Sequence, residues 1–292
     1  MRVSDLHIDR VYINKLFRSS DYTMSRNHYH YYYEIFYVQQ GSCRFFIDNA
    51  LYELRAGDFL VIPPHVIHYN RYLTGCMRYN IYFRKSDLQD YLNMSGAPEM
   101  GEHEWFSKTH LYHVPHAYRD LFAEHLEMMI KEDKLDDEVT SNLLMLELYQ
   151  FFLYVRRWCR LRDGSGNAAA VDDPILEASK FISEHYNQSI TLDLLASRAC
   201  LSPGYFSKRF RQVTGVGMKE YLTYVRLEHA SKELLTTDHT ITDVALNSGF
   251  ADSNYFKDAF KKMYGTSPRN YRKNRGNVAD PADAPALLAK ES

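Results

Sequence analysis

The stretch SPGYFSKRFRQVTG (Ser202–Gly215) returns fifty residues later as DSNYFKDAFKKMYG (Asp252–Gly265). In both copies an aromatic pair is followed by basic residues, a second phenylalanine and a closing glycine, which is typical of an amphipathic helix that ends at glycine. Ala196 or Ala245 precedes each copy and suits a close helix crossing. The repeat predicts two helix-turn-helix units, whose second helices would enter successive major grooves of one DNA duplex, since these grooves recur about every 34 Å.

Each copy divides into an apolar and a polar face. The expected inner residues are Phe206, Phe210 and Val213 in the first copy and Phe256, Phe260 and Met263 in the second. The outer residues are Gly204, Ser207, Lys208 and Arg211, and then Ser253, Asn254, Lys257, Asp258 and Lys261. An asparagine side chain can form two hydrogen bonds with adenine, and a lysine can donate to guanine. Basic residues one turn further on can contact the phosphates. For either copy alone, an ordinary helix with a solvated face is the alternative, and the duplication favours DNA binding.

The composition is that of a soluble globular protein with room for two domains. The 292 residues are 45% hydrophobic and carry a net charge of −2. Residues 173–275 hold 15 Lys and Arg against 11 Asp and Glu, so the basic excess lies with the repeat. Neither a signal peptide nor an apolar run of about 20 residues is evident, and we expect no membrane segment. The cysteines are scattered, which favours a reducing cytoplasm over a zinc module or a disulfide framework: Cys43, Cys76, Cys159 and Cys200.

Changes in periodicity divide the chain into four segments. Residues 1–162 are expected to form a sensing and dimerisation domain, and residues 163–172, rich in Gly and Ala, a flexible linker. Residues 173–275 predict an all-helical domain, and residues 276–292 a disordered tail.

Within the first segment, alternating apolar runs and turn residues predict strands over residues 1–112. From Pro115 the spacing becomes helical. A second helix, from about Glu138 to Trp158, is apolar on more than one face: Leu143, Leu144, Leu146, Leu148, Phe151, Phe152 and Val155. Such a wide stripe indicates two neighbours, the strands and a second subunit, whereas a plain buried helix is the alternative.

Capping residues set the helix boundaries in residues 173–275. Helices are expected to start at Asp173-Pro174, Thr191, Ser202-Pro203, either Thr240 or Thr242, either Asp252 or Ser253, and Ser267-Pro268. A long helix from about Met218 to Leu235 is expected to join the two halves rigidly.

The C-terminal segment resembles the AraC family of bacterial transcription regulators. The matching residues are Asp243-Val244-Ala245, Gly249-Phe250, Tyr255-Phe256, Phe260-Lys261, Gly265, Ser267-Pro268 and Tyr271-Arg272. The resemblance implies seven helices, with two helix-turn-helix units joined by one long helix. It implies base contacts from Gly204, Ser207 and Lys208, and from Ser253, Asn254, Tyr255 and Lys257.

Two positions depart from this family's pattern. Gly204 lacks a side chain where the family often presents one, so the first helix would read fewer bases. Asp258 stands where a positive or neutral residue is common. Its carboxylate could accept from cytosine, repel a phosphate, or pair with Lys261 or Lys262.

Residues 28–72 resemble the two motifs of the cupin β-barrels. The first motif is matched by His28, His30, Glu34 and Gly41, and the second by Gly57, Pro63 and His68, with His65 and Tyr72 replacing the usual glycine and asparagine. The resemblance implies a cupin-like barrel. In metal-binding cupins the matching ligands would be His28, His30, Glu34 and His68, a set that suits iron, manganese, zinc or nickel.

A metal-dependent cupin enzyme, such as a dioxygenase or isomerase, is therefore the rival hypothesis. We expect instead no catalysis and no cofactor, because no further acid-base pair is recognisable and an enzyme would not need the duplicated helices. The expected role is an effector pocket that suits a sugar or another flat polar ligand, lined by His28, His30, Tyr32, Glu34 and His68. A barrel interior without any ligand is the remaining alternative.

Together these features predict a cytoplasmic, homodimeric transcription regulator. It would bind a double-stranded DNA operator, respond to a small-molecule effector, and contact RNA polymerase if it activates. A DNA-binding module without effector, working by abundance, is the non-enzymatic alternative.

Overall fold

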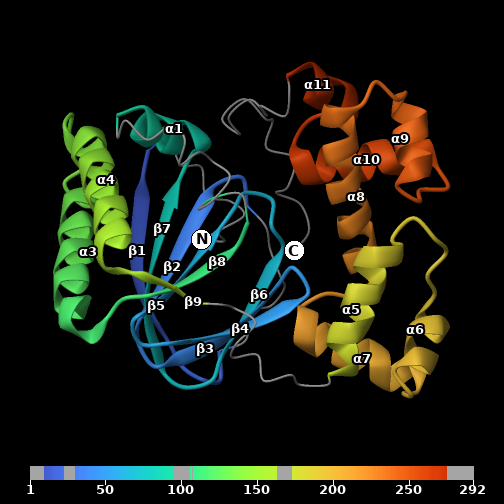
Figure 1. Cartoon of the computed structure of the whole chain (residues 1–292), viewed down its shortest axis with the longest axis horizontal. Coiled ribbons are helices and arrows are strands. Elements are labelled where there is room, and N and C mark those ends of the chain that lie inside the picture. The colour runs from blue at the N-terminus through green and yellow to red at the C-terminus, as the bar shows by residue number, and fades with distance from the viewer. Residues whose placement is uncertain (1–9, 23–29, 95–105, 107, 163–172, 275–292) are drawn as a thin grey trace. The chain divides into compact units, whose positions relative to one another are not determined.

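A computed structural model describes residues 10–22, 30–94, 106, 108–162 and 173–274 (Figure 1). The chain divides into two compact units, an N-terminal unit that ends at Val171 and a C-terminal unit that begins at Asp172. This boundary falls within the segment predicted to be a linker. The linker, residues 163–172, and the predicted tail, residues 276–292, lie outside the described residues.

The described strands of the N-terminal unit pair antiparallel into two sheets. The larger sheet has the order β1-β7-β2-β5-β8-β9, and the smaller has β4-β3-β6. Their bounds are β1 (Tyr12–Arg18), β2 (Tyr33–Gln40), β3 (Ser42–Ile47), β4 (Ala50–Arg55), β5 (Asp58–Ile62), β6 (His68–Tyr72), β7 (Cys76–Phe83), β8 (His110–His113) and β9 (Arg160–Arg162). Phe36 and Leu60 of the larger sheet share a buried cluster with Phe45 and Leu54 of the smaller, so the sheets face each other. The predicted barrel thus takes the form of two facing sheets.

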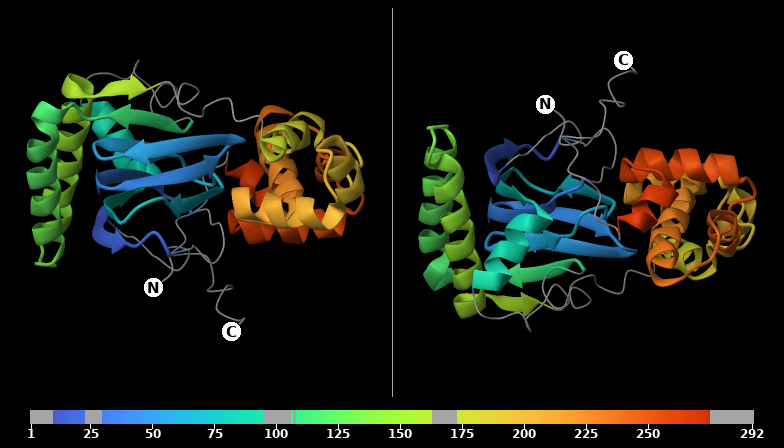
Figure 2. Two further views of the ribbon diagram at one scale, coloured as in Figure 1. Left: turned by 90° about the horizontal axis from the view of Figure 1, so that it is seen from below. Right: turned by 90° about the horizontal axis from the view of Figure 1, so that it is seen from above.

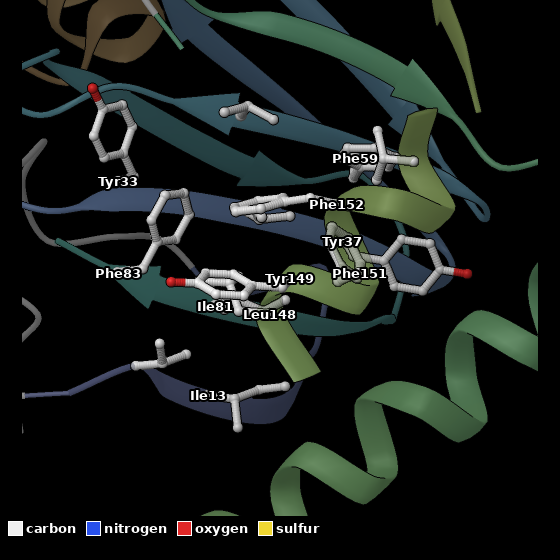
Figure 3. Close-up of a cluster of buried hydrophobic side chains, with 14 of the residues drawn as sticks. Ile13, Tyr33, Tyr37, Phe59, Ile81, Phe83, Leu148, Tyr149, Phe151 and Phe152 are labelled. Atoms are coloured by element: carbon white, nitrogen blue, oxygen red, sulfur yellow. The ribbon is translucent and has the colours of Figure 1, made fainter. Parts of the chain in front are cut away.

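Helices cover the outer face of the larger sheet, as Figures 1 and 2 show for α3 (Arg119–Asp133) and α4 (Thr140–Trp158). The short 3₁₀ turn η3 (His116–Tyr118) leads into α3, where the sequence predicts the change of period. Alternate residues of β2 point to this side and share a buried cluster with side chains of α4 (Figure 3): Tyr33, Ile35 and Tyr37 with Leu148, Phe151 and Phe152. Full burial of each such side chain stabilises the unit by about 1.5–3 kcal/mol.

Two elements of the N-terminal unit differ from the sequence prediction. Residues 85–94, predicted to belong to the strands, form the helix α1 (Lys85–Met94). Leu88, Tyr91 and Leu92 are spaced by three and four residues and are buried in the cluster beneath α4. The prediction was wrong here because this helical spacing is too short to stand out among alternating strands. The strand β9, after α4, was not predicted either.

The C-terminal unit contains the helices that the capping residues predict. They are α5 (Pro174–His185), α6 (Leu192–Arg198), α7 (Pro203–Thr214), α8 (Met218–Thr236), α9 (Ile241–Asn247), α10 (Ser253–Tyr264) and α11 (Pro268–Lys273). Asp173, Thr191, Ser202 and Ser267 accept backbone N–H groups as predicted. Of the paired candidates, Thr240 caps α9 and Asp252 caps α10.

One inner-face prediction for α7 was wrong. Val213 is only half-buried, whereas Thr214 is buried beside Phe206 and Phe210. The Thr214 hydroxyl lies 2.9 Å from the carbonyl oxygen of Phe210 and 3.0 Å from that of Val216. These local hydrogen bonds satisfy the threonine at the helix end and allow it to occupy the inner position.

Candidate DNA interface and ligand site

The two helix-turn-helix units, α6–α7 and α9–α10, repeat each other in detail. In each, a buried alanine lies where the helices cross, Ala196 at 1% and Ala245 at 0% exposure. The carbonyl oxygen of each alanine accepts an N–H at 2.9 Å, from Leu201 in the first unit and Phe250 in the second. The second helices end alike, at Gly215 with φ 81° and Gly265 with φ 69°. The left-handed backbone at these positions favours glycine, so the sequence repeat is a structural repeat.

The predicted reading residues lie on the outward sides of α7 and α10. Phe206, Phe210, Phe256 and Phe260 are fully buried and fix the inner sides. Ser253 is half-buried, and the other candidates are exposed: Gly204, Ser207, Lys208, Arg211, Asn254, Tyr255, Lys257 and Lys261. Asp258 is exposed as well.

Packing does not require the glycine at position 204. A Cβ built there would meet no atom within 4 Å. The fold of α7 is therefore compatible with larger residues at this position, and the glycine removes a side chain only from the predicted reading face.

Three predicted ligand-site residues come together between the two sheets. The Nε2 of His30 lies 2.8 Å, and the Nε2 of His68 3.4 Å, from the same Glu34 oxygen. All three side chains are buried. Tyr32 is buried in a neighbouring cluster with Tyr82. His28 lies outside the described residues.

Hydrogen bonds to backbone carbonyls determine that Nδ1 of each imidazole carries a hydrogen. The Nδ1 of His30 lies 2.7 Å from the Tyr32 carbonyl oxygen, and that of His68 lies 2.9 Å from the Val66 carbonyl oxygen. Because a carbonyl only accepts, each Nδ1 carries its hydrogen, and each Nε2 is directed at the carboxylate. Burial opposes ionisation of Glu34, yet the two histidines hold its pKa well below the usual value. The two imidazoles and the Glu34 carboxylate thus converge on one point in the interior.

The structure adds polar residues from β6 and β7 that sequence reasoning missed. Asn80 donates to the other Glu34 oxygen, and the Tyr82 hydroxyl lies 3.3 Å from it. Arg78 donates to the Tyr72 hydroxyl at 3.1 Å and also to Asn80. Arg78, Asn80 and Tyr82 occupy alternate positions of β7 opposite the inward residues of β2, and this alternation was the signal available in the sequence.

Asn70 contributes an acceptor to this interior. It is 6% exposed, and its Oδ1 has no hydrogen-bond partner among the described residues. Buried acceptors without partners cost about 1–3 kcal/mol. Such an atom can accept a hydrogen bond from a ligand.

His65 replaces a glycine of the cupin pattern at a position with φ 63°. Histidine tolerates the left-handed region better than most residues, so this turn can form without the glycine of the cupin pattern. Burial lowers the pKa of His65 to about 4, so its ring is neutral.

Two family models match the chain. The "AraC-like ligand binding domain" matches residues 16–148, and a "Helix-turn-helix domain" matches residues 195–274. The chain belongs to the AraC family of transcription regulators. In this AraC-type chain the first match runs from β1 into the first half of α4, and the second runs from within α6 to the end of α11.

Sequence relatives are regulators as well. An uncharacterised HTH-type transcriptional regulator of Staphylococcus aureus (strain MSSA476) is 24% identical over 245 residues, 84% of this chain and 32% of the relative. The HTH-type transcriptional activator RhaS of Escherichia coli is 24% identical over 251 residues, 85% of this chain and 87% of RhaS. The AraC-type chain thus spans about a third of the length of the staphylococcal relatives.

Two solved structures are also similar to parts of the chain. The DNA-binding domain of AdpA in complex with a target DNA is 32% identical, with a TM-score of 0.34, and covers 35% of this chain and 91% of the other. ToxT from Vibrio cholerae is 15% identical, with a TM-score of 0.37, and covers 91% of this chain and 98% of the other. Among the described helices, none combines the length and apolar character that a membrane crossing needs.

Proposed function

We propose that this AraC-type protein binds a specific double-stranded DNA operator through α7 and α10 and regulates transcription by binding rather than by catalysis. The observation that carries the proposal is the structural repeat, which exposes a basic side on two equivalent helices. Phosphate contacts would supply affinity and register, and a few outward side chains would supply sequence choice. Its place of action is the cytoplasm, and RNA polymerase is a further partner if the protein activates.

Substitutions in the two reading helices test this proposal. Lys208→Ala and Asn254→Ala should each weaken binding to a selected operator by about 1–3 kcal/mol, the size of one base contact. Arg211→Ala should weaken binding to all DNA sequences alike and reduce the salt slope by roughly one ion, because it contacts phosphate. Fluorescence anisotropy over a salt series, on operator and random duplexes, measures both effects. Equal losses for all three variants on random DNA would contradict these roles.

The interior between the sheets is the proposed effector site. It combines charged and hydrogen-bonding groups with aromatic rings, including Phe36 and Phe45, whose centroids are 4.7 Å apart. The acceptor of Asn70 and the carboxylate of Glu34 suit hydroxyl donors, and aromatic faces suit a sugar ring. We therefore propose a sugar-like effector, which would shift the regulator between states through its differential affinity for them.

A substitution at Asn70 should affect effector binding without lowering the stability of the folded protein. Asn70→Leu removes the buried acceptor without a partner, so the free energy of unfolding should stay unchanged or rise by about 1 kcal/mol. The same variant should lose the rise in melting temperature that an effector produces. A thermal-shift panel of common monosaccharides measures this, with the exposed Asn93→Leu as control. If no monosaccharide shifts the wild-type protein, the sugar class is wrong.

A metal ion is the second candidate occupant. His30, Glu34 and His68 each offer a ligand atom, and these atoms lie within 4.8 Å of one another. The Nδ1 hydrogen bonds to carbonyls orient both imidazoles as in many metal sites. The ion would be held by these three residues and, by the cupin resemblance, His28.

Elemental analysis of the purified protein decides between the two occupants. We expect less than stoichiometric transition metal, in line with an effector site. Stoichiometric metal that disappears in His30→Ala, and remains in the exposed control His116→Ala, would establish the metal site instead.

We further propose that the exposed apolar stripe of α4 pairs with a second copy of the chain. Leu144, Leu148 and Phe152 are fully or almost fully buried, but Leu146 is 56% and Leu153 50% exposed, seven residues apart on one stripe with Leu143. Met128 of α3 is 57% exposed. Heptad spacing suits helix pairing, and a two-fold dimer lets the same stripe meet itself.

Charges on this stripe should separate the subunits. Leu146→Glu combined with Leu153→Glu should give monomers, because two carboxylates per subunit would be buried without partners. Sedimentation over a range of concentrations measures the state, and Met94→Glu, 61% exposed on α1, is the control. A dimer that survives the double substitution would exclude this interface.

A further inference from the structure

One set of contacts in the C-terminal unit brings together α8, the end of α5 and the turn of the second helix-turn-helix unit. Arg226, in the middle of α8, donates from Nε to the carbonyl oxygen of Tyr186 at 2.8 Å and from Nη2 to that of Gln188 at 2.9 Å. These carbonyls lie at the end of α5, where Tyr186 is the C-cap residue. Carbonyl groups at a helix end lack partners within the helix, and a guanidinium satisfies two of them at once.

The turn of the second helix-turn-helix unit closes on the same point. Gly249, between α9 and α10, has φ 83°, and a Cβ there would lie 2.8 Å from Asn187 Cα, 2.9 Å from Tyr186 O and 3.0 Å from Arg226 Nε. The Arg226 guanidinium also lies over the ring of Phe250, 5.9 Å from its centroid. Phe250 packs against Phe256 of α10, with centroids 5.2 Å apart. We call Arg226, the Tyr186 and Gln188 carbonyls, Gly249 and Phe250 the Arg226 clamp.

The other end of α5 is tied to the first reading helix. Asp173, the N-cap of α5, forms an ion pair at 3.3 Å with Arg209 of α7. The helix α5 has 12 residues and is therefore about 18 Å long. It contacts α7 near its beginning and, through the Arg226 clamp, the turn before α10 at its end. Through α5, the first reading helix is thus connected to the turn before α10, in addition to the direct connection by α8.

We propose that Arg226 is a positioning residue that sets the geometry between α7 and α10, and so determines which spacing of two half-operators the protein accepts. Its guanidinium is directed at protein carbonyls, away from the outward sides of the reading helices. When one helix is bound, the second binds at an effective concentration that depends on how rigidly the two are joined. Loosening the clamp lowers this effective concentration and leaves each helix's own contacts unchanged. The inference rests on the proposed function.

The test compares whole and half operators. A duplex selected by the full-length protein from a random pool serves as the operator, and duplexes with one half randomised serve as half-operators. Arg226→Gln should bind the whole operator about tenfold more weakly and the half-operators within about twofold of wild type. Lys232→Gln, which removes one charge from an exposed ion pair with Glu228 on the same helix, should change neither.

Spacing gives a readout that a general loss of stability would not produce. Each base pair inserted between the halves turns one half by about 35° relative to the other, and wild-type affinity should fall steeply. With Arg226→Gln the fall should be shallower, because a loosely joined pair tolerates rotation. Arg226→Lys replaces the forked guanidinium with the point charge of an ammonium group. Its loss of affinity per inserted base pair should lie between those of wild type and Arg226→Gln.

A second variant reaches the same contact from the opposite side. Gly249→Ala places a Cβ against Asn187 and Tyr186 and should reproduce the loss of spacing selectivity. Circular dichroism at the assay temperature confirms that each variant is folded. Equal losses on whole and half operators, or unchanged spacing dependence in both variants, would overturn the role of Arg226. Failure to select any specific duplex would instead reject the proposed function.

Discussion

Two phenylalanines four residues apart on each of α7 and α10 fix the orientation that these helices would present to DNA in the proposed function. Phe206, Phe210, Phe256 and Phe260 are fully buried, and truncation of such a side chain costs about 3–5 kcal/mol. A single base contact contributes about 1–3 kcal/mol. The orientation of each helix is therefore held more strongly than any one contact that it makes. Outward residues can change, as the open space around Gly204 indicates, while the outward face proposed to contact DNA keeps its orientation.

Whereas apolar side chains hold the helices of the C-terminal unit, the N-terminal unit contains a buried polar network. Glu34, His30, His68 and Asn80 are buried and hydrogen-bonded to one another, beside a cluster that contains Phe36 and Phe45. Well-packed apolar residues would often be as stable as such a network or more so. A polar interior that retains an acceptor without a partner is consistent with selection for binding rather than for stability.

The strand β2 connects that interior with the proposed dimer helix. Its residues Glu34 and Phe36 face the smaller sheet, whereas Ile35 and Tyr37 share the buried cluster of α4. A ligand that changes the position of β2 therefore changes the surface against which α4 packs. It can shift the protein between two states only as far as its affinities for them differ. The side chains of one strand thus connect the proposed effector site with the proposed subunit contact.

The sequence by itself determined what depends on neighbouring residues. Capping groups and closing glycines placed the helices of the C-terminal unit, but two pairs of N-cap candidates stayed open until the structure selected Thr240 and Asp252. The resemblance to the cupin motifs grouped His30, Glu34 and His68 as one set of candidate site residues. These signals are local, because the hydrogen bonds of a cap and the faces of a strand are set within a few residues.

Only the tertiary structure decided which distant segments meet. The contact of Asn80 with Glu34 spans 46 residues, and that of Arg226 with Tyr186 spans 40. No local pattern marks such pairs, since their partners are brought together by packing of whole strands and helices.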